Sequence, residues 1–353
     1  MNRILVIRLS ALGDVIFALP ALALLRERYP DAALSWVVED KAASLLLHRK
    51  DLARVIVYPR KTLRKNARNP LRWPAMIALV ARHVGQLRRE RYDLALDFQG
   101  NLKSGVHTLL ARAARKVGFA RGHVKERNDL FTREQVTPPE KAVHRIEKNI
   151  ALVDPGYTSA DIKRPDLQLP VAVVEEAEKA MGSVRRSPGP LMIVHPGTSA
   201  FGAYKRWAPE KFGRLARRLR KERGFETLVT WGKDERPLAE RVVTAGGEGV
   251  HIAPASPSLL HLAAYIQFGT VYVSADSGPL HIANYLGVPC LALFGPKDPA
   301  LYRPYFPPSR VVRSDVDCSP CTRRTCDAPI CMEKLEVEDV YGALSGLLDE
   351  AST

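Results

Sequence analysis

Short apolar runs alternate with longer amphipathic stretches along the whole chain. In its first part, runs rich in Val, Ile and Leu predict buried strands, and apolar residues that recur every three or four positions predict helices. The predicted strands are 2–7, 33–38, 54–58 and 92–98, with a long helix at 73–89. Residues 14–28 predict another helix, in which Pro20 marks either a kink or the start of the regular part. Residues 60–72 are dense in Arg and Lys and predict a basic loop.

The same alternation returns after residue 190. Strands are predicted at 191–195, 226–231, 250–252, 271–273 and 290–294, and helices at 209–223, 237–244, 258–266 and 279–285. Alternation of this kind is typical of parallel sheets covered by helices. Because the polar, proline-rich stretch 154–190 separates the two series, we predict two domains, 1–165 and 166–353. The expected fold class is α/β, with two Rossmann-like, doubly wound parallel-sheet domains that face a cleft.

Charge is unevenly distributed between the two predicted domains. Residues 1–150 contain 29 Lys and Arg against 14 Asp and Glu, whereas residues 151–353 contain 24 of each kind. A basic domain indicates an acidic partner, such as nucleic acid, an anionic membrane surface or a phosphorylated substrate. We rank nucleic acid lowest, because the chain shows no recognisable binding module and no interleaving of basic and aromatic residues.

The apolar stretch at the start of the chain does not predict a signal peptide. Arg8, Gly13 and Asp14 interrupt it, and its pattern is that of a strand followed by a helix. No apolar run approaches the roughly 20 residues that are needed to cross a bilayer. We therefore expect a cytoplasmic protein.

One strand–turn–helix unit in the second domain stands out chemically. The polar turn 275–278 follows a buried strand, and Pro279 opens the next helix, where its missing N–H would have been unpaired in any case. Backbone N–H groups at the start of a helix favour an anion. The unit therefore fits a nucleotide diphosphate site, although many such turns in α/β proteins bind nothing.

Other polar residues follow predicted strands in both domains. Asp14 either caps the helix that it precedes or acts as a general base. Lys103 either belongs to an ordinary first helical turn or contacts a ligand. In the second domain the hydroxyls of Thr198 and Ser199 suit phosphate oxygens, and Lys205 can supply positive charge beside them.

Four strings in the sequence resemble motifs of glycosyltransferase family 9, the lipopolysaccharide heptosyltransferases. They are RLSALGDVIFALPAL at 8–22, DFQGNLKS at 97–104, HPGTS with KRW at 195–207, and ADSGPLHIANYLGVPCLALFGPKDP at 275–299. The second is similar to the heptosyltransferase I type of that family. The resemblance implies the two-lobed glycosyltransferase B architecture. It also implies an inverting, metal-independent transfer of heptose from ADP-heptose to the inner core of lipopolysaccharide.

The resemblance also implies roles for individual residues. Asp14 would deprotonate the acceptor hydroxyl, and Lys205 would stabilise the departing ADP. Residues expected to bind the donor are Gly197, Thr198, Ser199, Asp234, Glu235, Asp276, Ser277, Gly278 and His281. Residues expected to bind the acceptor are Gly13, Arg60, Arg64, Gln99, Lys103 and Arg121. The sequence does not decide which of Asp234 and Glu235 contacts the ribose.

The implied partners are an ADP-heptose-type nucleotide sugar, a phosphorylated lipid A–core acceptor and the anionic surface of the inner membrane, met from its cytoplasmic face. No cofactor is expected, because no G-x-G-x-x-G string opens a helix, and no D-x-D ends a strand to hold a divalent ion. The sequence predicts no oligomeric state. The alternatives are transfer of another sugar or to another acceptor, a nucleotide-sugar epimerase, a non-catalytic nucleotide binder on the same fold, and a basic nucleic-acid-binding protein.

Four cysteines lie close together in the sequence near the C-terminus. They are Cys318, Cys321, Cys326 and Cys331, in the string CSPCTRRTCDAPIC. Their spacing begins as a C-x2-C pair but lacks the second pair of a zinc ribbon. A disulfide is disfavoured in the cytoplasm. We predict structural thiols in a loop, and rank a metal site second and a redox function third.

Overall fold

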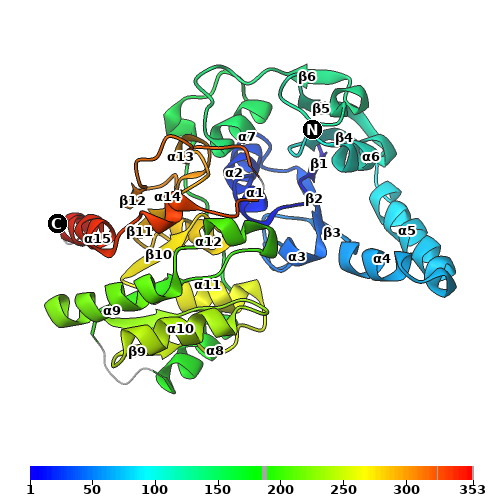
Figure 1. Ribbon diagram of the computed structural model, residues 1–353. Coiled ribbons are helices and arrows are strands. Elements are labelled where there is room, and N and C mark those ends of the chain that lie inside the picture. The colour runs from blue at the N-terminus through cyan, green and yellow to red at the C-terminus, as the bar shows by residue number, and fades with distance from the viewer. Residues whose placement is uncertain (185–188, 324, 352–353) are drawn as a thin grey trace. The chain divides into compact units, whose positions relative to one another are not determined.

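The chain folds into two compact units, Met1–Pro165 and Asp166–Thr353, in a computed structural model that describes residues 1–184, 189–323 and 325–351 (Figure 1). Each unit contains one six-stranded, all-parallel sheet with helices around it. The predicted α/β class and the two doubly wound parallel sheets are thus confirmed. No helix within the described ranges combines the length and the apolar character that a membrane crossing requires.

Unit 1 carries the sheet order β3-β2-β1-β4-β5-β6. Its strands are β1 (Arg3–Ile7), β2 (Ala33–Glu39), β3 (Arg54–Tyr58), β4 (Tyr92–Asp97), β5 (Ala113–Phe119) and β6 (Glu134–Val136). Its α-helices are α1 (Leu12–Ile16), α2 (Leu19–Arg28), α3 (Asp40–Ala43), α4 (Arg60–Ala67), α5 (Trp73–Arg88), α6 (Leu102–Leu110) and α7 (Arg145–Val153). The central strand β1 is buried along Ile4–Ile7, as expected for a parallel strand covered on both faces.

Unit 2 carries the order β12-β11-β10-β7-β8-β9. Its strands are β7 (Leu191–His195), β8 (Glu226–Val229), β9 (Val250–Ile252), β10 (Val271–Ala275), β11 (Cys290–Leu293) and β12 (Ser309–Val312). Its α-helices are α8 (Val171–Gly182), α9 (Pro209–Arg223), α10 (Arg236–Gly246), α11 (Leu259–Gln267), α12 (Gly278–Tyr285), α13 (Pro299–Tyr302), α14 (Ile330–Glu333) and α15 (Val337–Ala351). Numbered from the first strand of each unit, the two sheets have the same strand order.

This shared order fixes where ligands can bind. In each unit the chain leaves the first strand toward one side of the sheet and returns on the other side at the fourth strand. The carboxyl ends of these two neighbours, β1 with β4 and β7 with β10, form the topological switch point. Loops diverge there and leave a crevice, which is the usual ligand site of an open α/β sheet. The loops after β1, β4, β7 and β10 therefore carry the residues of interest.

One local prediction was wrong, and one of the two interpretations of Asp14 is excluded; both concern residues near the carboxyl edge of unit 1. The predicted basic loop 60–72 is helix α4 followed by a 3₁₀ turn at Pro70–Arg72. The many charged residues of this segment led to the prediction of a loop. Arg, Lys, Leu and Ala are nevertheless all good helix formers, and the side chain of Leu63 is buried. Asp14 is not an N-cap, because Ala11 holds that position and Asp14 lies inside the first turn of α1. The interruption at Pro20 is real, since α1 ends at Ile16 and α2 begins at Leu19.

Candidate functional site

At the switch point of unit 2, the predicted catalytic residue Lys205 lies together with two predicted donor-binding residues, Asp276 and His281. The Lys205 ammonium donates to the Asp276 carboxylate over 2.8 Å and to the Asp276 carbonyl oxygen over 2.8 Å. The His281 Nε2 lies 3.7 Å from the other carboxylate oxygen of Asp276. Asp276 comes directly after β10, and His281 lies in the first half of α12, so the turn between them brings the two side chains together. The group presents a buried carboxylate with cationic and imidazole partners.

The environment of Asp276 changes its ionisation. Burial raises the pKa of this carboxyl, but the hydrogen bond from His281 and the charge of Lys205 outweigh burial and lower the pKa to about 2. The carboxylate is therefore charged at every pH at which the protein works. Lys205 and Asp276 neutralise one another as an ion pair, in which both side chains are largely buried.

A second buried acid, Glu235, lies at the exit of β8. Its carboxylate accepts a hydrogen bond from the Gly232 N–H over 2.9 Å and lies 3.4 Å from His195 Nε2. The other His195 nitrogen, Nδ1, contacts the Thr230 hydroxyl at 3.1 Å. Burial raises the pKa of Glu235, but the His195 ring and the Gly232 amide together bring it below its usual value. Gly197 lies directly against this acid, because a Cβ there would overlap the Glu235 carboxyl group.

The structure separates the two acids that the sequence left open. Asp234 is exposed and adopts a left-handed backbone conformation with φ of 68°, whereas Glu235 points back toward β7. The sequence had no means to choose between them, since the choice depends on the turn Gly232–Glu235. Glu235 therefore lies beside His195 at the exit of β7, and Asp234 faces solvent.

The hydroxyl groups of the unit 2 site differ in their hydrogen bonding. The Thr198 hydroxyl is buried and donates to the Gly202 carbonyl oxygen over 2.8 Å, while Arg206 Nε donates to it over 3.1 Å. Thr198 thus holds its own loop together, which leaves its hydroxyl no further proton to donate. Ser199 is exposed. The Ser277 hydroxyl, at the N-cap of α12, is buried without a hydrogen-bond partner, and Gly278 starts the helix beside it.

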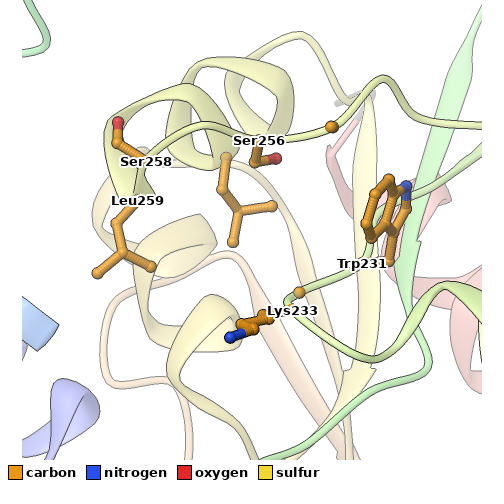
Figure 2. Close-up of a pocket in the computed structure, with 8 residues that line it drawn as sticks. Trp231, Lys233, Ser256, Ser258 and Leu259 are labelled. Atoms are coloured by element: carbon orange, nitrogen blue, oxygen red, sulfur yellow. The ribbon is translucent and has the colours of Figure 1, made fainter. Parts of the chain in front are cut away.

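A pocket of about 290 Å³ opens at the same carboxyl edge of unit 2 (Figure 2). Trp231 lies on one side, Ser258 and Leu259 lie on the other, and Lys233 reaches toward the space between them. The Trp231 ring is held in place because its N–H donates to the Ala253 carbonyl oxygen over 2.8 Å. The sequence analysis did not identify this pocket, because its walls come from the β8 exit and from the loop before α11. Its aromatic and aliphatic lining suits a flat, largely apolar group.

The switch point of unit 1 holds Asp14 in a defined orientation. Arg8 Nη2 lies 2.8 Å from one carboxylate oxygen, and the Ala11 N–H donates to the other over 3.2 Å. Arg8 itself is anchored, because its guanidinium donates to the Phe98 carbonyl oxygen at the end of β4. The Asp14 side chain is 30% exposed, so a ligand can reach it. Gly13 precedes it within α1 and is half-buried.

Glu39 is a central residue of unit 1 that the sequence analysis missed. It ends β2, its side chain is only 3% exposed, and it forms ion pairs with both Lys103 and Arg60. Lys103 also donates to the Ser10 hydroxyl over 3.1 Å. Acids are almost never fully buried unless paired, so the position of Glu39 at the end of a predicted buried strand was the available signal.

The remaining acceptor-site predictions fall into two groups. Gln99 joins the β1 and β4 exit loops, because its side-chain oxygen accepts from the Leu9 N–H over 2.8 Å and from the Ser10 N–H over 3.1 Å. Arg64 and Arg121 are exposed, and neither is drawn into the Glu39 group. The structure therefore brings together Asp14, Gln99, Lys103 and Arg60, and leaves these two arginines outside.

The clustered cysteines form no disulfide, and burial raises the pKa of the Cys331 thiol. Cys331 lies in α14, whereas the other three lie in irregular backbone before it. Across residues 1–184, 189–323 and 325–351, no three His, Cys, Asp or Glu side chains are grouped so as to hold a metal ion.

Comparisons with known proteins connect this geometry to a family. The family profile described as glycosyltransferase family 9 (heptosyltransferase) matches residues 80–331. The chain is 29% identical to lipopolysaccharide heptosyltransferase 1 of Pseudomonas aeruginosa, with 98% of each protein covered. It is similar in fold to a family 9 glycosyl transferase from Veillonella parvula, with a TM-score of 0.79, 20% identity, and 99% and 97% of the two chains covered. It is also similar in fold to E. coli heptosyltransferase WaaC with ADP, with a TM-score of 0.76, 23% identity and 99% of each chain covered.

Proposed function

The chain belongs to glycosyltransferase family 9, the heptosyltransferases, and from that premise we propose that it transfers heptose from ADP-heptose to the inner core of lipopolysaccharide. The Pseudomonas relative named lipopolysaccharide heptosyltransferase 1 supports this choice of reaction. The observation that carries the proposal is the Lys205, Asp276 and His281 group at the N-terminus of α12, where a diphosphate finds both a helix dipole and a lysine.

Unit 2 would bind the donor. The diphosphate meets the N–H groups at the start of α12, and the otherwise unpartnered Ser277 hydroxyl donates to one of its oxygens. The adenine occupies the pocket beside Trp231, whose lining accepts a flat ring. Glu235 lies between that pocket and the β7 exit, so its carboxylate accepts hydrogen bonds from the ribose hydroxyls.

Unit 1 would activate the acceptor. An acceptor hydroxyl gives its proton to Asp14 as its oxygen attacks the anomeric carbon of the heptose. The bond from that carbon to the diphosphate oxygen breaks, the electron pair leaves with ADP, and the configuration inverts because attack and departure take place on opposite faces. Lys205 and the α12 amides stabilise the charge that develops on ADP, so the proposed step draws its positive charge from the protein and needs no divalent ion.

Lys103, Arg60 and Gln99 would position the acceptor. The two cations share Glu39 as a counterion, and a phosphate of a lipid A–core acceptor can exchange with that carboxylate. Gln99 holds the β1 exit loop, and with it the segment before Asp14.

The direct test is a transfer assay with ADP-heptose and an inner-core acceptor that lacks heptose, in buffer containing EDTA. We expect a product heavier by one heptose in the mass spectrum and an equal amount of ADP. Release of free heptose alone, or a requirement for added divalent ion, would contradict the proposed reaction. A run without acceptor separates the alternatives, because an epimerase alters the sugar there and a non-catalytic binder leaves it intact.

A further inference from the structure

Helices α4 and α5 expose an unusual set of large apolar side chains. Leu71 is 91% exposed, Ile77 is 65% exposed and Trp73 is 51% exposed, and Val80 is exposed as well. In Figure 1 the two helices extend outward from the sheet of unit 1 beside β3. We call residues 60–88, which comprise α4, the 3₁₀ turn and α5, the docking hairpin.

The apolar stripe of α5 is packed at one end only. Residues 73, 77, 80, 84 and 87 recur at the spacing that keeps side chains on one face of a helix. At the C-terminal end this face contributes to the core, since Leu87 is fully buried, and the nearby His83 packs edge-on against Tyr58 of β3. At the N-terminal end the same face carries Trp73 and Ile77, which are exposed. The apolar stripe thus continues beyond the part of α5 that packs on the core of unit 1. An exposed apolar surface of this kind indicates a binding partner that covers it.

Positive charge surrounds the exposed end of this stripe. The basic residues of the docking hairpin that point to solvent are Lys61, Arg64, Lys65, Arg68 and Arg72. Residues 60–72 contain no acid at all. An apolar patch with Trp and long aliphatic chains, rimmed by Lys and Arg alone, matches an anionic lipid surface, whose headgroups attract the cations and whose acyl boundary accepts the apolar groups.

The docking hairpin also lies at the functional edge of unit 1. Arg60, the first residue of α4, forms an ion pair with Glu39, which in turn pairs with Lys103. The N-terminal half of α5 lies toward the same carboxyl edge of the sheet, because the helix runs antiparallel to the strands and leads into the start of β4. A lipid surface at this edge would present the headgroup of a lipid substrate next to Asp14.

We propose that the docking hairpin binds the surface of an anionic bilayer, with Trp73, Ile77, Leu71 and Val80 inserted at the level of the headgroups and the lysines and arginines of α4 against the lipid phosphates. The choice of a lipid surface over other partners rests in part on the proposed lipid-linked acceptor. The contact would hold the enzyme on the membrane that contains its substrate.

The charge part of the proposal is tested by sedimentation with vesicles, without donor or acceptor. The full-length protein should bind vesicles that contain phosphatidylglycerol and should not bind pure phosphatidylcholine vesicles. Replacing Lys61, Lys65 and Arg68 by Gln together should weaken binding about fivefold per charge, or about a hundredfold. The matched control replaces three exposed lysines of unit 2, Lys179, Lys221 and Lys334, by Gln and should bind within twofold of wild type. Equal loss in both triple variants would overturn the proposal.

The apolar part is tested through Trp73 itself. Trp36 and Trp207 are fully buried and Trp231 is half-buried, so Trp73 is the exposed tryptophan of the chain. Anionic vesicles should shift its emission to shorter wavelength, and brominated lipid should quench it. Trp73→Phe should keep binding and lose the shift, whereas Trp73→Ser combined with Ile77→Ser should bind at least tenfold more weakly. An unchanged emission spectrum in wild type at saturating vesicles would overturn insertion.

A second copy of the chain is the competing occupant. Sedimentation velocity without lipid should show the same mass for wild type and for Ile77→Ser. A dimer that this substitution dissolves, together with no vesicle binding, would assign the face to self-association and overturn the proposal. These assays use neither ADP-heptose nor acceptor, so their failure leaves the proposed transfer reaction standing, and failure of the transfer assay leaves membrane binding standing.

Discussion

The carboxyl edges of the two sheets share a strand order and differ in how they treat charge. In unit 2, Lys205 and Asp276 are 19% and 13% exposed and neutralise one another at a single point. In unit 1, one buried acid, Glu39, serves two cations, of which Arg60 is 52% exposed. Further basic residues of α4 surround this edge without acids among them. The strand order therefore determines where a ligand site lies, and the balance of charge at that site determines which kind of ligand it can bind. A compact, neutralised site suits one constant group, the nucleoside diphosphate, and an open basic edge suits a large phosphorylated acceptor.

Asp14→Asn is the largest expected effect and separates the roles of the two edges. The amide keeps the shape of the side chain but accepts no proton, so kcat should fall about 10³-fold. The affinity for ADP, measured by calorimetry, should stay within twofold of wild type because the proposed ADP site lies in unit 2. Asp31→Asn, at an exposed aspartate of the same unit, is the control and should keep full activity. Retained turnover with weakened ADP binding would reverse the assignment of the two edges.

Lys205→Gln tests whether the cation of the unit 2 site contributes to ADP binding and to the reaction. Loss of the cation at the departing diphosphate should lower kcat by about 10² and weaken ADP binding about tenfold. It should also lower the free energy of unfolding by about 3 kcal/mol, because Asp276 is left as a buried charge whose cationic partner is gone and beside which only His281 remains. Lys221→Gln, at an exposed lysine of α9, should change none of these three quantities. An unchanged rate in the Lys205 variant would remove it from the chemistry.

The pH dependence of stability tests the neutralised site of unit 2, because the pKa of its Asp276 carboxyl is lowered to about 2. The pKa of Asp276 falls from 3.8 to about 2 on folding. As the pH falls, the carboxylate is therefore protonated at a lower pH in the folded state than in the unfolded state. The stabilisation is fully present above about pH 4 and is lost as the pH falls toward 2, by about 2 kcal/mol. Urea unfolding of the wild type between pH 5 and pH 2 should show this loss, and Asp276→Asn should show a shallower acid limb.

Gly197→Ala tests whether Glu235 belongs to the donor site. The added Cβ would overlap the Glu235 carboxyl group and push it from its contact with His195. We expect the Kd for ADP to rise about tenfold with a smaller change in kcat, since one charge-assisted hydrogen bond to the ribose is worth about 1.5 kcal/mol. Gly342→Ala has open space around its Cβ and should leave ADP binding unchanged. Equal Kd values for the two variants would place the ribose elsewhere.

Arg60→Gln is the smallest expected effect and concerns the open edge. Because this arginine is largely exposed, its interactions are screened by solvent, and the KM for the acceptor should rise only about three- to fivefold. The KM for ADP-heptose should not change. A rise in the KM for ADP-heptose instead would contradict the assignment of the acceptor to the edge of unit 1.

Hydrophobic pattern and motif strings were sufficient to predict most of the elements that carry the site. The strand that ends at His195, the strand that begins at Val271, the helix after Asp276 and the long helix α5 all follow from local periodicity, and the structure confirms them, with β10 two residues longer than predicted. The strand order could not be predicted from local pattern, because it is fixed by pairing between segments that are distant in the sequence. The role of Glu39 was missed for the same reason, since its two partners come from α4 and α6.

Side-chain contacts within turns were also beyond local reasoning. The choice of Glu235 over Asp234 depends on one turn with a positive φ, and the engagement of Thr198 depends on Arg206 and on a carbonyl group four residues away. The helix α4 was missed because its many charges were taken as the mark of a loop. The exposed face of α5 was missed as well, because periodicity alone assigns its apolar residues to the core.

An internal counterion sits beside Lys205 before any ligand arrives. Free phosphate gains little by entering, since it must displace a carboxylate that already satisfies the lysine and the histidine. In the proposed donor complex the base and the ribose of a nucleoside diphosphate also bind unit 2, and these contacts would offset the exchange. We therefore expect the resting enzyme to bind abundant small anions weakly, and we expect an inhibitor built on a phosphate mimic alone to meet the same barrier.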